Sequence, residues 1–148
     1  MSTSAHDHDH QEDQSQALLH LPLAGLLPPD QKLVINPSIR TATLFSYTPD
    51  GEAQIVAQQQ FSPNGMRVLV PLLQAYPNYC PYEVLLVALF SLTVDEARLQ
   101  LHEIREIALR SIRRAIGSLA TGLRALGLRV RSVRSTRYLV EPLSPTSA

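Results

Sequence analysis

The chain has one cysteine and no tryptophan, and no apolar run is long enough to cross a membrane. The single Cys80 cannot form a disulfide within one chain, which is typical of a reducing compartment. Polar and acidic residues fill positions 1–16, where a signal peptide would have a basic and then an apolar segment. We therefore expect a cytoplasmic protein without a membrane partner.

Sequence signatures of catalysis are also missing. No Ser/His/Asp or Cys/His arrangement, glycine-rich phosphate loop or paired metal-ligand motif is visible. His6, His8 and His10 alternate with aspartates, but a metal site needs ligands that a folded frame holds in place, so we expect no metal there. His102 is expected on a helix surface. The sequence thus argues against an enzyme and predicts no cofactor.

Lysine is nearly absent, and the cationic charge is unevenly distributed. Lys32 is the one lysine among 13 cationic residues, and the rest are arginines. Residues 1–60 hold seven acidic and two basic side chains, whereas residues 107–140 hold eight arginines and no acid. Guanidinium groups suit bidentate recognition of phosphates and base edges, and a merely solvated surface usually includes counter-charges. This segregation indicates a surface that binds nucleic acid.

The length of 148 residues, with 45% apolar and 18% charged side chains, allows one globular domain. We predict a disordered, acidic, histidine-containing tail over residues 1–30, a domain over residues 31–142 and a frayed end over residues 143–148. β-Branched and alternating residues predict strands at 32–35, 41–47 and 53–61, with a hairpin turn at Asp50-Gly51. A small antiparallel sheet should therefore open the domain.

Helix signals follow this sheet. Ser62-Pro63 predicts a helix start, and Pro71 should kink or shorten that helix. Residues 82–90 predict a short helix that is almost wholly apolar and must therefore be buried. Thr93 and Glu96 form a capping-box pattern, which opens a periodic segment up to Gly127. That segment is one helix or two, with a break at Gly117 or near Ile107.

Arginines and small polar residues share one side of the helix after Ile107. At about 100° per residue, an apolar stripe lies on the opposite side and should pack on the core. The residues predicted to face DNA from this helix are Arg110, Ser111, Arg113, Arg114, Ser118, Thr121 and Arg124. A second cationic element follows, because residues 128–134 and 137–141 predict a hairpin whose candidate DNA contacts are Arg131, Arg134 and Arg137.

The run from Leu128 to Pro142, LRVRSVRSTRYLVEP, resembles the C-terminal wing of OmpR/PhoB-type winged-helix regulators, which has a similar Val-Arg-Gly-x-Gly-Tyr pattern. The resemblance spans roughly residues 39–142 and implies an α+β winged helix-turn-helix fold: a small N-terminal antiparallel sheet, a three-helix core and a C-terminal β-hairpin wing. It also implies that the helix after Ile107 is the recognition helix. Ser135 and Arg137 replace the glycines of the wing, so its tight turn is not assured. We expect no receiver domain, because the residues before Lys32 are too few to form one.

The sequence therefore predicts a transcription regulator that binds double-stranded DNA sequence-specifically, with the recognition helix in the major groove and the wing on the backbone or in the minor groove. The alternative is a winged-helix module that binds another protein and has no specific DNA target, since the apolar residues 82–90 would also suit an interface. Further candidate partners are RNA polymerase, another regulator and a second copy of the chain.

Overall fold

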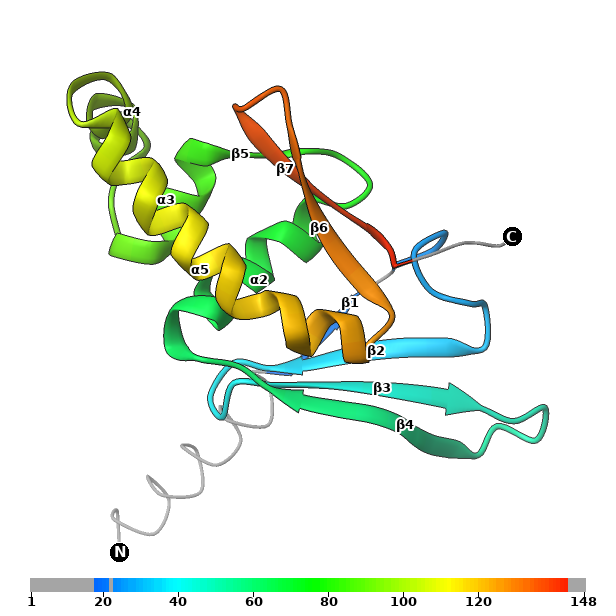
Figure 1. Ribbon diagram of the computed structural model, residues 1–148. Coiled ribbons are helices and arrows are strands. Elements are labelled where there is room, and N and C mark those ends of the chain that lie inside the picture. Colours follow the sequence, from blue (N-terminus) through cyan, green and yellow to red (C-terminus); the bar gives the residue numbers. More distant parts are fainter. Residues whose placement is uncertain (1–17, 22, 144–148) are drawn as a thin grey trace, which may run out of the picture.

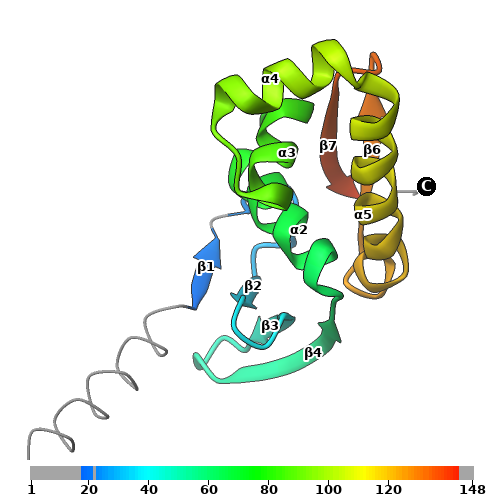
Figure 2. The same cartoon turned by 90° about the vertical axis from the view of Figure 1, so that its left-hand side faces the viewer.

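Two antiparallel sheets and four helices make up residues 18–21 and 23–143, which the computed structural model describes (Figure 1). The α+β class predicted from the sequence is therefore confirmed. The helices lie on one side of the larger, four-stranded sheet, and the smaller sheet packs beside them (Figures 1 and 2).

The four-stranded sheet has the order β1-β2-β3-β4, with every neighbouring pair antiparallel. Its last three strands are β2 (Gln31–Asn36), β3 (Thr41–Tyr47) and β4 (Ala53–Gln60), which confirm the three predicted strands to within one or two residues. Gly51, with φ of 89°, occupies the predicted turn between β3 and β4, where a side chain would be strained.

The structure differs from the predicted tail from Leu19 onward. Strand β1 (Leu19–Leu21) pairs with β2, and Leu23 and Leu26 are buried in the core. The prolines of this segment favoured the prediction of a tail. Its leucines explain the difference, because apolar side chains lower the free energy of the fold when they are buried. The domain thus begins before residue 31. Residues 1–17, with the histidine cluster and the acidic tail, and residues 144–148 lie outside the described part of the chain.

Helix α2 (Pro63–Ala75) begins as predicted, since Ser62 is its N-cap and accepts a hydrogen bond of 3.0 Å from the backbone N–H of Gly65. The helix continues through Pro71 to Ala75, so the expected shortening does not occur. Proline removes one backbone donor, but the buried side chains on either side of it anchor both halves of the helix in the core.

Helix α3 (Tyr82–Phe90) has the predicted bounds, and the short strand β5 (Cys80–Pro81) precedes it. The expected burial of α3 is incomplete, because Val84 and Phe90 are exposed while Leu85, Leu86 and Leu89 are buried. Helix α3 packs against α2, α4 and α5, and these three neighbours still leave part of its apolar surface exposed.

The long periodic segment forms two helices. Thr93 and Glu96 make both hydrogen bonds of the predicted capping box at the start of α4 (Val94–Glu103). The chain leaves the helical conformation at Ile104, with φ of −131°, and resumes as α5 (Arg105–Ala125). The break therefore lies near Ile107, and Gly117 is inside α5.

The C-terminal hairpin consists of β6 (Leu128–Val133) and β7 (Arg137–Pro142), and β5 pairs with the outer edge of β7. A tight turn forms without glycine, because Arg134 and Ser135 both adopt positive φ, at 53° and 55°. Such conformations are uncommon for residues with a side chain.

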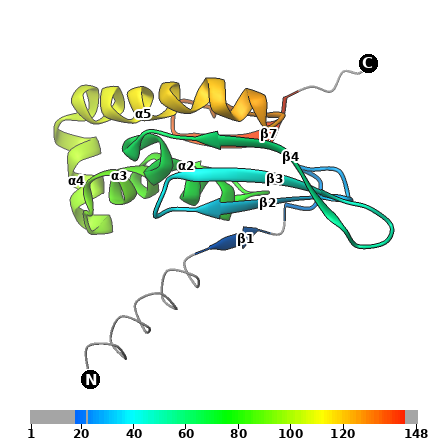
Figure 3. The same cartoon turned by 90° about the horizontal axis from the view of Figure 1, so that it is seen from below.

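The core lies between the four-stranded sheet and the helices (Figure 3). Its most deeply buried large side chains are Leu33, Ile35, Leu69, Leu72, Leu73, Leu85, Leu86, Ile112, Leu119, Leu123 and Leu128. Helix α5 approaches the end of β4 so closely that a Cβ at Gly122 would lie 2.5 Å from Phe61. This contact fixes α5 against the sheet and leaves its opposite face outward.

Candidate nucleic-acid interface

The outward face of α5 is built by the period of the helix. Its buried residues recur every three or four positions, from Ala108 to Leu123, and pack on the core. The predicted residues of the opposite face are all exposed except Ser111, which is half-buried. Those exposed residues are Arg110, Arg113, Arg114, Ser118, Thr121 and Arg124.

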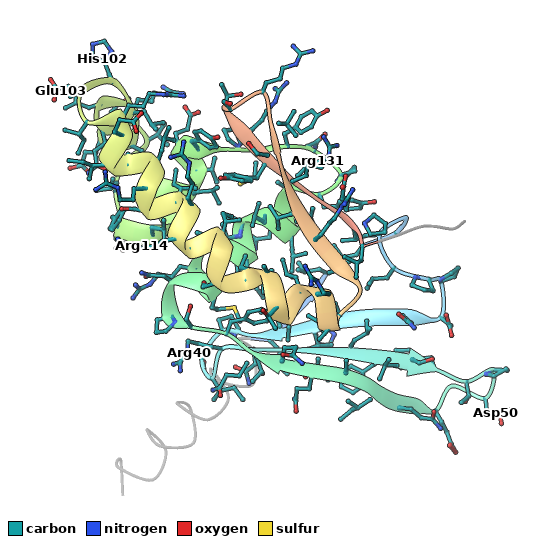
Figure 4. The ribbon with its side chains drawn as sticks, viewed as in Figure 1. Arg40, Asp50, His102, Glu103, Arg114 and Arg131 are labelled. Atoms are coloured by element: carbon teal, nitrogen blue, oxygen red, sulfur yellow. The ribbon has the colours of Figure 1, made fainter. Side chains whose placement is uncertain are left out.

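All five arginines of α5 lack an ion-pair partner among the residues that the structure describes, and four of them belong to the predicted face: Arg110, Arg113, Arg114 and Arg124. An acidic residue does lie in the first turn of this helix, because α5 begins at Arg105 and so includes the exposed Glu106. Since four cationic groups face one carboxylate, the face of α5 is strongly cationic. Figure 4 shows Arg114 extending outward from α5.

The two serines predicted to face DNA bond within the protein instead. The hydroxyl of Ser111 donates to the carbonyl of Ile107 (3.3 Å), and that of Ser118 donates to the carbonyl of Ala115 (2.7 Å). Ser118 also accepts a hydrogen bond of 3.2 Å from the N-cap residue Ser62. The structure thus gives Ser118 a second task, which is to tie α5 to the start of α2.

A surface hollow of about 290 Å³ lies beside this contact. It is lined by the first residues of α2 and by Arg114, Ala115 and Ser118 of α5. The first N–H groups of a helix have a partial positive charge. Arg114 and the start of α2 therefore present two sources of positive potential side by side.

Arginines on the hairpin are engaged within the protein. Glu141 of β7 forms ion pairs with Arg129 and, at 3.0 Å, with Arg131 of β6 (Figure 4 shows Arg131). Partial burial raises the pKa of Glu141, but the hydrogen bonds from Arg131 and Arg129 outweigh it and leave the pKa below its usual value. Arg131, a predicted DNA contact, therefore shares a cross-strand carboxylate with Arg129.

Arg137, another predicted contact, is half-buried and lies over the ring of Tyr79, 4.3 Å from its centroid. Its Nε atom is buried without a hydrogen-bond partner among the described residues. Arg137 thus holds the loop before β5 against β7.

The rings of Tyr82 and Tyr138 lie nearby, with their centroids 5.4 Å apart. Burial, and after it the neighbouring Tyr82, raise the pKa of Tyr138.

The tip of the hairpin presents an exposed arginine and contacts the start of α5. Arg134 is exposed at the turn, and no ion pair engages it in the described ranges. The guanidinium of Arg105 donates a hydrogen bond of 3.2 Å to the carbonyl of Ser135. Arg105 was missed by sequence reasoning, because only the fold brings residues 30 positions apart together.

Helix α4 has the opposite electrostatic character. It buries only Ala97, and its exposed residues include Asp95, Glu96 and Glu103 as well as the apolar Leu99. Its Arg98 pairs with Glu83 of α3 at 2.9 Å. His102, at the end of α4 in Figure 4, is exposed on the helix surface as predicted.

Compared with known families, with curated proteins and with solved structures, the chain has no match. Across the described ranges, no helix combines the length and apolar character needed to cross a bilayer.

Proposed function

We propose that this chain is a winged helix-turn-helix regulator that binds double-stranded DNA, with α5 in the major groove and the β6–β7 hairpin beside it. The observation that carries the proposal is the outward face of α5, where four exposed arginines lack an ion-pair partner in the described part of the chain. Like charges held this close repel one another unless an anionic ligand neutralises them, and duplex DNA is a dense array of phosphates.

The order of elements supports this proposal. A small sheet, helices and a C-terminal hairpin follow one another as in the OmpR/PhoB-type domains that the run from Leu128 to Pro142 resembles. The hydrogen bond from Arg105 to Ser135 joins the start of α5 to the hairpin tip, so one ligand can contact both. In helix-turn-helix proteins the N-terminal part of the recognition helix contacts the bases.

The start of α2 offers a site for the DNA backbone. The start of α2 borders the hollow beside Arg114, and a phosphate placed there would interact favourably with the positive end of the helix dipole, while Arg114 extends from α5 toward the bases. In this arrangement α5 would supply the base contacts, and its flanks would contact phosphates.

Binding of a short random-sequence duplex, followed by fluorescence anisotropy from about 50 to 200 mM salt, tests the proposal. The logarithm of affinity should fall linearly with the logarithm of salt, at about 0.9 for each phosphate contact. Wild-type protein that does not bind duplex DNA even at the lowest salt would refute the proposal.

A matched control distinguishes the effect of the α5 surface on DNA binding from the effect of net charge. Arg110→Ala/Arg114→Ala and Lys32→Ala/Arg98→Ala each remove two positive charges, but only the first pair alters α5. The α5 pair should weaken binding and lower the salt slope by about two, whereas the control should bind nearly as wild type. Equal losses in both variants would mean that binding depends on net charge alone.

A second candidate function, binding to another protein, is favoured by α4. Its exposed Leu99 and Val94 lie among carboxylates, a composition suited to a partner with a basic and partly apolar surface. RNA polymerase, another regulator and a second copy of the chain remain candidates. Leu99→Ala should weaken such an association, measured by analytical ultracentrifugation with the purified partner, and leave DNA affinity unchanged.

A further inference from the structure

Ile107 is the most exposed large apolar residue of the described helices, with 57% of its surface accessible. It lies in the first turns of α5, where the core side of the helix is occupied by Ala108, Leu109 and Ile112. On a helix with 3.6 residues per turn, Ile107 is about 60° from Arg110 and about 20° from Arg114 around the axis. The apolar side chain therefore shares the outward face with the arginines.

The neighbours of Ile107 limit what can cover it. An apolar protein surface would also have to bury Arg110 and Arg114, which form no ion pair in the described ranges although Glu106 lies one turn before Arg110, and burial of an unpaired charge is strongly unfavourable. The major groove of DNA combines the two chemistries that this face needs. Phosphates and guanine edges bind arginine, and the C5-methyl group of thymine makes apolar contacts with side chains.

We propose that Ile107 determines part of the sequence specificity by contacting the C5-methyl group of a thymine in the major groove. This inference rests on the proposed DNA binding and adds to it the kind of base that α5 recognises. Removing the thymine methyl takes away roughly one buried methyl group, which corresponds to about a three- to fivefold change in affinity.

The spacing on the helix also predicts where that thymine lies. Ile107 and Arg110 are separated by about 4.5 Å along the axis of α5, and base pairs stack about 3.4 Å apart. Arginine most often contacts guanine O6 and N7. The preferred site should therefore contain a guanine within one or two base steps of the thymine.

Replacement of thymine by deoxyuridine tests the contact, because it removes only the methyl group. A preferred site is first selected from random duplex DNA with wild-type protein, and each thymine is then replaced singly. At one position, deoxyuridine should weaken wild-type binding about three- to fivefold and leave the affinity of Ile107→Ala unchanged. Ile107→Val, which keeps most of the apolar surface, should retain sensitivity at the same position.

Leu99→Ala is the matched control, because Leu99 is similarly exposed, at 53%, but lies on α4. It should retain the full wild-type sensitivity to deoxyuridine. If every replacement affects wild type and Ile107→Ala equally while both bind the site, Ile107 does not contact a thymine methyl and this inference is wrong although the proposed function stands. If wild-type protein selects no site and binds no duplex, both proposals fail together.

Discussion

The two arginine-rich regions of this chain, α5 and the β6–β7 hairpin, use the same residue for different purposes. On α5, Arg110 and Arg114 point outward without an ion-pair partner in the described ranges. On the hairpin, Glu141 binds Arg129 and Arg131, and Arg137 lies over Tyr79. A helix separates its polar and apolar faces, whereas antiparallel strands bring side chains together across the pair, as Glu141 does with Arg129 directly opposite and Arg131 on the diagonal.

This difference revises the role of the hairpin in the proposed interface. Arginine density marks where positive charge is concentrated but not whether that charge is available to a ligand. Within the hairpin, Arg134 at the tip is the residue that the structure leaves exposed and without an ion-pair partner among the described residues. The α5 arginines should therefore dominate DNA affinity, and the hairpin arginines should contribute more to stability.

The largest effect is expected for Arg114→Ala. If this side chain contacts a base, the substitution should cost about 1–3 kcal/mol of specific binding, measured by titration of the selected site. Thermal unfolding should hardly change, because the residue is exposed and makes no ion pair with described residues. Wild-type affinity in this variant would exclude base contact by Arg114.

Glu141→Gln should leave the hairpin arginines without an ion-pair partner, as the arginines of α5 are in the described ranges. With its carboxylate removed, Arg129 and Arg131 become available to phosphate, so DNA affinity and the salt slope should rise, the slope by at most about two. The free energy of unfolding should fall by about 0–1 kcal/mol, since these arginines are half-exposed.

The pH dependence of stability provides a check on that variant. Because the folded pKa of Glu141 is lowered, the ion pairs stabilise the fold above the ordinary carboxyl pKa. This contribution disappears as the pH falls through the lowered value. As the pH falls, the free energy of unfolding of Glu141→Gln should therefore decrease less than that of wild type. Identical pH profiles of stability in the two proteins would contradict the assigned ion pairs.

Ser135→Gly should stabilise the hairpin turn. Ser135 has φ of 55°, a conformation that glycine adopts without steric cost, and the gain should be about 1 kcal/mol, or roughly 3–5 °C in Tm. Ser132→Gly is the matched control in β6, where glycine should destabilise by about 0.5–1 kcal/mol. Loss of stability in both variants would argue against the positive φ at the turn.

Arg137→Ala should have the smallest effect on binding and a measurable one on folding. Loss of the contact with Tyr79 should lower the free energy of unfolding by about 0.5–1 kcal/mol in chemical denaturation. The salt slope of DNA binding should stay at the wild-type value. A decrease of about one would instead assign Arg137 to a phosphate, as the sequence pattern alone predicts.

Features encoded locally could be predicted from the sequence. The N-cap at Ser62, the capping box of Thr93 and Glu96, and the strands of both hairpins depend on neighbouring residues, and the structure confirms them. The three-residue strand β1 gave no such signal, because its position depends on the exposed edge of β2.

Contacts within the candidate site were harder to predict for the same reason. The pairing of Arg131 with Glu141 depends on strand register, and the bond from Arg105 to Ser135 depends on how the hairpin packs beside α5. The sequence places Ser118 on the outward face, but it could not indicate that this hydroxyl meets Ser62 across two helices. Periodicity thus predicts which face a residue occupies, and the fold determines which partners it meets.

The most direct test compares two matched double variants in the salt titration of duplex binding. Arg113→Ala/Arg114→Ala removes two arginines from α5, and Arg129→Ala/Arg131→Ala removes two from the hairpin, with the same change in net charge. We predict that the α5 variant loses about two units of salt slope, whereas the hairpin variant keeps nearly the wild-type slope. An equal loss in both variants, or a larger loss in the hairpin variant, would contradict the account.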